Sequence, residues 1–171
     1  MITGYRERNV IVNTFEWLEM SDLAEWVGGS VVGYPLMLVS HAIGLAIVVG
    51  IFSVLNMRIL GLFNGISFVA FVPLIKLAWV GFVLNFISGC ALFTAQATVF
   101  IDSTPFLIKI ASIFLAGINA AFMQNAIKLN ADRWDKGATV TGSVRFMAIA
   151  SLLLWSTAVV AGRMIAYLDV E

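Results

Sequence analysis

The chain has 171 residues and no net formal charge; 61% of its residues are hydrophobic and only 12% are charged. A soluble domain usually carries about a quarter charged residues, so this composition excludes a protein whose whole surface faces water. The zero net charge gives no indication of nucleic-acid binding. The single cysteine, Cys90, excludes an intrachain disulfide and a cysteine-based zinc site within one chain.

The chain begins with a polar segment, for which we predict no cleavable signal peptide. Its charged residues Arg6, Glu7 and Arg8 leave no room for an apolar core, and no small-residue cleavage site follows. We therefore expect the first hydrophobic helix to insert into the membrane uncleaved.

A helix is predicted from Asn13 to Val27, lying on the membrane surface rather than crossing it. Its acidic residues recur at every third position and cover one side, while aromatic and aliphatic residues cover the other. The tryptophans of the apolar side belong at headgroup level. Surface helices of this kind are usually basic, so an acidic one favours docking to a protein partner; the alternative is a solvated acidic face. The acids are Glu16, Glu19, Asp22 and Glu25.

Four apolar stretches each reach the roughly 20 residues that a helix needs to cross a bilayer. They run from about Tyr34 to Met57, Pro73 to Ala97, Pro105 to Ile127, and Ser143 to Tyr167. The sequence therefore predicts an all-α fold, namely an integral membrane four-helix bundle preceded by an N-terminal amphipathic interfacial helix. Residues 1–33 would form the N-terminal region and residues 34–171 the four-helix domain.

The connections between the spans are predicted to differ in character. Residues 58–72 are too apolar for a free loop and are interpreted as an interfacial or re-entrant stretch packed on the bundle. Residues 96–103 form a short turn. Lys128 to Thr141 contains several charged residues and is predicted to be the one properly aqueous loop.

Basic residues predict the orientation through the positive-inside rule. An even number of spans places both termini on one face, and more of the basic residues lie on the opposite face. Those opposite residues are Arg58, Lys76, Lys128, Arg133, Lys136 and Arg145. We therefore predict that both termini lie outside.

Polar side chains inside a span are the strongest functional pointers in a membrane protein. His41, Lys109 and Arg163 come from three different spans and fall at a similar depth near the outer end, with Cys90 at a comparable level. We predict that the three cationic donors converge on an anionic or carbonyl-bearing group, such as a lipid headgroup, a quinone or a haem propionate. The alternative for Lys109 and Arg163 is snorkelling to the headgroups.

Other polar residues carry less specific interpretations. His41 is the only histidine, so a haem bound there would need a second chain or an open axial position; a hydrogen-bonded core imidazole is the alternative. Asn119 is predicted to face the bundle and to hydrogen bond between helices. The spans contain no carboxylate, which argues against a proton-coupled transporter. No catalytic or metal-binding motif is recognised, so no catalytic or metal residue is predicted.

Three stretches of the sequence resemble a known family: SHAIGLAIVVG followed by NMRILGL, then STPFLIKIASIFLAGINA, then SLLLWSTAVVAGRMIAY. The family is the DUF6644-like group of small, uncharacterised bacterial four-helix membrane proteins, and the likeness extends from Tyr34 to Tyr167. It implies the four-helix fold and a bacterial inner-membrane location, and it implies no function. The residues that match the pattern are His41, Arg58, Lys109, Asn119, Trp155 and Arg163.

These observations favour a non-enzymatic integral subunit of a larger membrane complex. Such a subunit would scaffold other membrane proteins and hold a membrane lipid or a cofactor at the outer leaflet. The alternative is a small redox module that binds haem or quinone near His41. No nucleic-acid partner is expected, and both termini would lie on the periplasmic side of the bacterial inner membrane.

Overall fold

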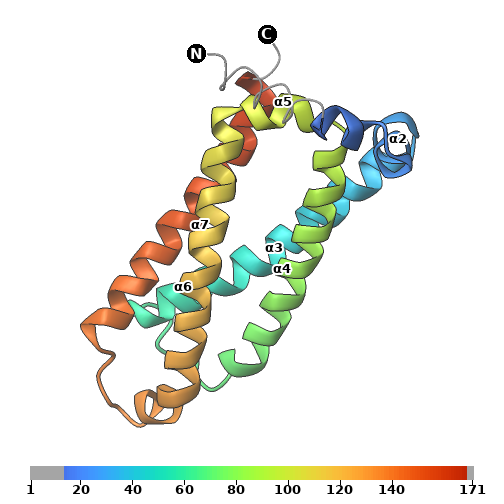
Figure 1. Cartoon of the computed structure of the whole chain (residues 1–171). Coiled ribbons are helices and arrows are strands. Elements are labelled where there is room, and N and C mark those ends of the chain that lie inside the picture. Colours follow the sequence, from blue (N-terminus) through green and yellow to red (C-terminus); the bar gives the residue numbers. More distant parts are fainter. Residues whose placement is uncertain (1–13, 169–171) are drawn as a thin grey trace, which may run out of the picture.

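A computed structural model describes residues 14–168 of the chain (Figure 1). The prediction about a signal peptide and the predicted start of the first helix at Asn13 lie outside these residues. Four long helices have the length and apolar composition of membrane spans: α3 (Gly33–Ile59), α4 (Phe71–Thr94), α6 (Thr104–Asp135) and α7 (Gly142–Leu168). The predicted all-α membrane bundle is therefore confirmed.

The four spans pack as two antiparallel pairs, α3 with α4 and α6 with α7 (Figure 1). Helix α3 also packs against α7, whereas α4 and α6 make few contacts with each other. As predicted, Asn119 bonds between helices: its Nδ2 donates to the Met147 carbonyl oxygen of α7 at 2.9 Å. The two pairs are thus joined along α3 and α7 and stand apart at α4 and α6.

The apolar core lies mainly in the half of the bundle far from the short helix α5 (Ala97–Asp102). Phe52, Ile75, Met123 and Ile127 are almost completely buried there and come from three different spans. Large apolar side chains are also exposed along the outer faces of the same helices. Apolar residues on both the inside and the outside are expected of a bundle surrounded by lipid.

The predicted surface helix is wrong as a single element, because it consists of two helices. Residues 14–19 are helical, the chain turns at Met20 and Ser21, and α2 (Asp22–Gly29) follows. The Ser21 hydroxyl accepts a hydrogen bond from the Ala24 backbone N–H at 3.3 Å and so caps α2. The regular spacing of the acids concealed this cap. Helix α2 packs against the ends of α3 and α4.

The predicted aqueous loop from Lys128 to Thr141 is wrong over more than half of its length. Helix α6 continues to Asp135, and the connection consists of residues 136–141. The extension has a packing partner, because the Trp134 ring lies edge-on to Phe68 with centroids 5.2 Å apart. The charged residues therefore do not mark the end of the helix.

The connection between α3 and α4 folds into turns that pack on the bundle, as predicted for residues 58–72. Phe68 is buried there, and the Arg58 guanidinium lies 4.2 Å from the centre of its ring. Arg58 Nε also donates to a backbone carbonyl of this connection at 2.6 Å. The Asp135 carboxylate at the end of α6 accepts hydrogen bonds from Ser67 Oγ (2.6 Å), Phe68 N (2.8 Å) and Val69 N (3.1 Å).

The second connection is more ordered than the predicted short turn. Helix α4 ends at Thr94 rather than Ala97, and α5 occupies much of the connection. The Glu19 carboxylate accepts two hydrogen bonds from Thr98, one from the backbone N–H and one from the hydroxyl, both at 2.8 Å. The N-terminal helical segment is thereby tied to the start of α5.

Candidate ligand-binding cavity

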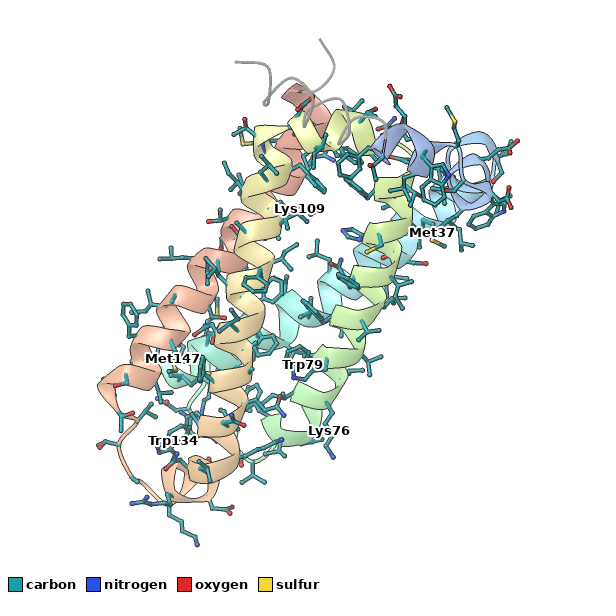
Figure 2. The ribbon with its side chains drawn as sticks, viewed as in Figure 1. Met37, Lys76, Trp79, Lys109, Trp134 and Met147 are labelled. Carbon is teal, nitrogen blue, oxygen red and sulfur yellow. The ribbon has the colours of Figure 1, made fainter. Side chains whose placement is uncertain are left out.

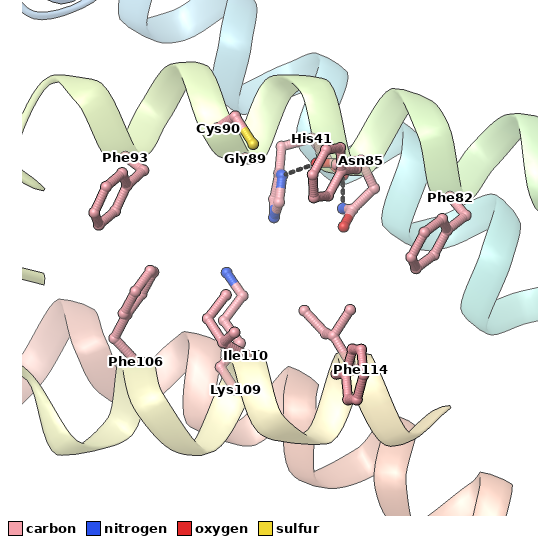
Figure 3. Close-up of a pocket in the computed structure, with 12 residues that line it drawn as sticks. His41, Phe82, Asn85, Gly89, Cys90, Phe93, Phe106, Lys109, Ile110 and Phe114 are labelled. Carbon is pink, nitrogen blue, oxygen red and sulfur yellow. Dashed lines mark hydrogen bonds between the residues drawn. The ribbon is translucent and has the colours of Figure 1, made fainter. Parts of the chain in front are cut away.

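A cavity of about 410 Å³ lies between α4 and α6, where the two helix pairs separate. Its wall is almost entirely apolar, and its polar side chains are His41 from α3, Asn85 from α4 and Lys109 from α6 (Figure 3). The thiol-bearing Cys90 also lines it. An apolar cavity with a few converging polar groups is the usual form of a small-molecule site.

Close packing of α3 on α4 builds one wall of this cavity. A Cβ atom placed on Gly44 would lie 2.6 Å from the Asn85 backbone nitrogen and 2.7 Å from the Gly81 carbonyl oxygen. Only glycine permits these two backbones to approach so closely, which is a common arrangement of membrane helices. The approach brings His41 of α3 within hydrogen-bond reach of α4.

His41 and Asn85 bind each other's backbone. His41 Nδ1 lies 3.0 Å from the Asn85 carbonyl oxygen, and Asn85 Nδ2 donates to the His41 carbonyl oxygen at 2.9 Å. A carbonyl oxygen only accepts, so Nδ1 carries a proton and donates. In the neutral ring, Nε2 is therefore an acceptor. Gly89 leaves room for the ring, since a Cβ atom there would lie 3.1 Å from His41 Cε1.

Lys109 reaches into the cavity from the opposite wall, and its ammonium group points toward the His41 ring (Figure 3). Its aliphatic arm lies over Gly162 of α7, where a Cβ atom would be 3.4 Å from Lys109 Cδ. Within residues 14–168 the structure gives this ammonium group neither a hydrogen bond nor an ion pair. A cation inside a span is costly unless it is paired, so the cavity favours an anionic or carbonyl-bearing occupant.

Phenylalanine side chains bound the cavity at both of its ends (Figure 3). Phe93 and Phe106 face each other at the end near α5, with parallel rings whose centroids lie 5.4 Å apart. The stack continues to Phe100 of α5, 5.3 Å from Phe106. Phe82 and Phe114 lie at the other end (Figure 3). The polar groups thus occupy the middle of an aromatic chamber, which is open on one side because Phe114 and Cys90 of its lining are exposed.

The structure brings two of the three predicted ligand-binding residues together. His41 and Lys109 line the cavity, with Cys90 at the same level, but Arg163 is not among the lining residues. Its guanidinium NH2 group donates to the Tyr167 hydroxyl at 3.2 Å and lies 5.3 Å from that ring's centre, on an exposed side chain. Lys109 points into the chamber, whereas Arg163 remains at the outer surface of α7.

Asn85 and Gly89 of the cavity wall, and Gly81 at the α3–α4 contact beside it, were not singled out from the sequence. Gly81, Asn85 and Gly89 follow each other at four-residue steps, which places them on one face of α4. This stripe of small and polar residues in an otherwise large and apolar span is the signal that could have identified the wall facing His41.

The four acids predicted to bind a partner are placed differently from one another. Glu16, Asp22 and Glu25 are exposed, whereas Glu19 is bound to Thr98 within the chain. Large apolar side chains are exposed beside them, with Trp17 71% and Met20 80% accessible.

Comparison of the chain with family models, curated proteins and solved structures finds no match.

Proposed function

We propose that the protein is a non-enzymatic integral membrane subunit that scaffolds a larger complex and holds a lipid or lipid-soluble cofactor at the outer leaflet. The observation that carries the proposal is Lys109, a cation that points into an aromatic chamber without a described partner. An occupant with a phosphate, carboxylate or carbonyl oxygen would accept hydrogen bonds from this ammonium group.

His41 defines the second requirement for the occupant. With Nδ1 donating to Asn85, a neutral His41 presents Nε2 as an acceptor. The favoured occupant therefore carries an oxygen acceptor beside a hydroxyl donor, attached to an apolar body that fills the aromatic chamber. Phospholipids with a glycerol headgroup and quinones in their reduced or half-reduced forms both meet this description.

A small redox module is the alternative, and one observation favours it. Ligating histidines almost always donate their second ring N–H to a carbonyl or carboxylate, and His41 does so to Asn85 at 3.0 Å. In this alternative, a quinone or haem would occupy the chamber next to Nε2. An absorption spectrum of the purified protein in the visible region distinguishes a haem protein from a lipid-binding subunit.

The only cysteine lines the cavity and makes the proposal directly testable. The rate at which a maleimide labels Cys90 in detergent should fall when phosphatidylglycerol or a short-chain ubiquinol is added, and the protecting compound identifies the class of occupant. Lys109→Leu should abolish the protection. Lys76→Leu, an exposed position on α4 far from the cavity (Figure 2), should leave it intact.

Two results would refute this proposal. Labelling of Cys90 could be unchanged by both compounds, or the protection could persist in the Lys109→Leu variant. Arg163→Leu provides a further comparison: it should leave the protection unchanged if the occupant stays inside the chamber, and should weaken it if the headgroup extends outward to Arg163.

The acidic surface near the N-terminus is proposed to contact the other subunits. Glu16, Asp22 and Glu25 stand beside the exposed side chains of Trp17 and Met20, a combination suited to a basic and apolar partner surface. Replacing the three exposed acids by Gln should reduce co-purification of partner subunits, and Glu19→Gln alone should not.

We further propose a bacterial inner-membrane location with both termini periplasmic, supported by the basic-residue distribution and by the resemblance to the DUF6644-like family. In a Cys90→Ser background, a membrane-impermeant thiol reagent applied from outside should label Asp102→Cys on α5 and should not label Lys136→Cys in the 136–141 connection. Both positions are exposed. The reverse pattern would place the cavity in the cytoplasmic leaflet.

A further inference from the structure

The contact between α3 and α7 is the seam that joins the two helix pairs. Its centre is a stack of Phe52 on Trp155, with ring centroids 6.3 Å apart and ring planes 18° from parallel. Both rings are buried, with Trp155 only 3% accessible. This seam is distinct from the cavity, which lies between α4 and α6.

Polar side chains are buried in this seam without partners. Four buried side-chain atoms have no hydrogen-bond partner within residues 14–168: Asn56 Nδ2, Asn56 Oδ1, Ser151 Oγ and Trp155 Nε1. Asn56 is 0% accessible and Ser151 is 1% accessible. All four unpaired atoms belong to three residues of α3 and α7.

The helix register places Asn56 and Ser151 at one level. Asn56 follows Phe52 by four residues, and Ser151 precedes Trp155 by four. Helices α3 and α7 are antiparallel. The residue one turn after Phe52 on α3 is therefore level with the residue one turn before Trp155 on α7. The offset is about 6 Å along each axis. Asn56 therefore lies at the level of Ser151, one turn along the seam from the Trp155 ring.

Unpaired polar groups are costly in an apolar interior, and buried water commonly satisfies such groups by making about three hydrogen bonds. We propose that the α3–α7 seam contains an internal water site held by Asn56, Ser151 and Trp155. Trp155 Nε1–H donates to the water, Asn56 Oδ1 accepts from it, and Ser151 Oγ does either. The inference is independent of the proposed lipid or cofactor, since none of these residues lines the cavity.

The direct test is a nuclear magnetic resonance experiment on the full-length protein in detergent. A cross-peak between water and the Asn56 side-chain amide protons, with the rotating-frame sign of dipolar contact rather than of exchange, would support the site. Absence of a water cross-peak at both Asn56 Nδ2 and Trp155 Nε1 would overturn it.

A pair of serines on α7 provides the matched variants. Ser151→Ala should weaken the water cross-peak and lower the thermal midpoint by about 3 °C. Ser156→Ala, on the exposed side of the same helix, should change neither. If the seam is dry, Ser151→Ala removes an unpaired hydroxyl, so an unchanged or raised midpoint would overturn the proposal.

Discussion

The helix contacts of α4 differ sharply on its two sides. Toward α3, glycines at positions 44 and 81 bring the backbones together, and His41 and Asn85 bind across the contact. Toward α6, phenylalanine side chains hold the two helices apart, and a cavity remains between them. The hydrophobic effect does not drive helices together in lipid, so close packing must do so. Small side chains on one face of α4 allow direct helix contact, and large side chains on the other face leave room for a site.

The contact between α3 and α4 should be the more sensitive of the two to an added atom. Gly44→Ala would place a Cβ atom 2.6 Å from the Asn85 backbone nitrogen, and the overpacking should destabilise the protein by about 3 kcal/mol. The thermal midpoint and the monodisperse fraction in size-exclusion chromatography measure this effect.

Gly50→Ala is the control for this substitution, because nothing lies within 4 Å of a Cβ atom there. It should be neutral or stabilising by roughly 0.5–1 kcal/mol, as expected for alanine in a helix. Equal effects at the two glycines would mean that close backbone packing does not hold α3 to α4.

The end of the bundle far from α5 connects the pairs through Asp135. Asp135→Ala removes three hydrogen bonds to the α3–α4 connection. Because the carboxylate is exposed, the expected loss is only about 1 kcal/mol. Limited proteolysis should cleave residues 61–67 faster in this variant. Asp132→Ala, exposed one turn earlier on α6, should not change the rate.

The smallest expected effect concerns the side of α4 that faces α6. Trp79 Nε1 donates to Gln124 Oε1 at 2.6 Å and links these two helices below the cavity. Gln124→Leu should cost about 0.6 kcal/mol, the average for hydrogen bonds between membrane helices, and should speed maleimide labelling of Cys90. Asn125→Leu, at the exposed neighbouring position, should leave labelling unchanged. Slower labelling would mean that the bond holds the cavity open.

Hydropathy and length predicted the four spans, because crossing a bilayer imposes both directly. The ends of the spans were less predictable. The break at Met20 and Ser21 depends on one serine cap, and the extension of α6 to Asp135 depends on packing of Trp134 against Phe68. The serine cap is a local signal that the regular spacing of the acids concealed, whereas the Trp134–Phe68 contact joins residues far apart in the sequence.

The candidate site was partly predictable for a similar reason. Depth along each span placed His41, Cys90 and Lys109 at one level, and all three line the cavity. Depth does not determine rotation about the helix axis, and rotation separates Lys109 from Arg163. The stripe of Gly81, Asn85 and Gly89 signals a packed face of α4, but a single sequence does not reveal that α3 is the helix that packs on it.

The length of α6 has a mechanical consequence. Lys109 stands near one end of this helix and Asp135 ends it, about 40 Å apart at 1.5 Å per residue. That distance exceeds the roughly 30 Å thickness of the hydrocarbon layer, so one rigid rod extends from the cavity to the aqueous layer on the other side. A tilt of α6 that accommodates a bulkier occupant would displace Asp135 and so move the α3–α4 connection to which it is hydrogen bonded. The conformation of that connection would then depend on what occupies the cavity at the other end of the helix.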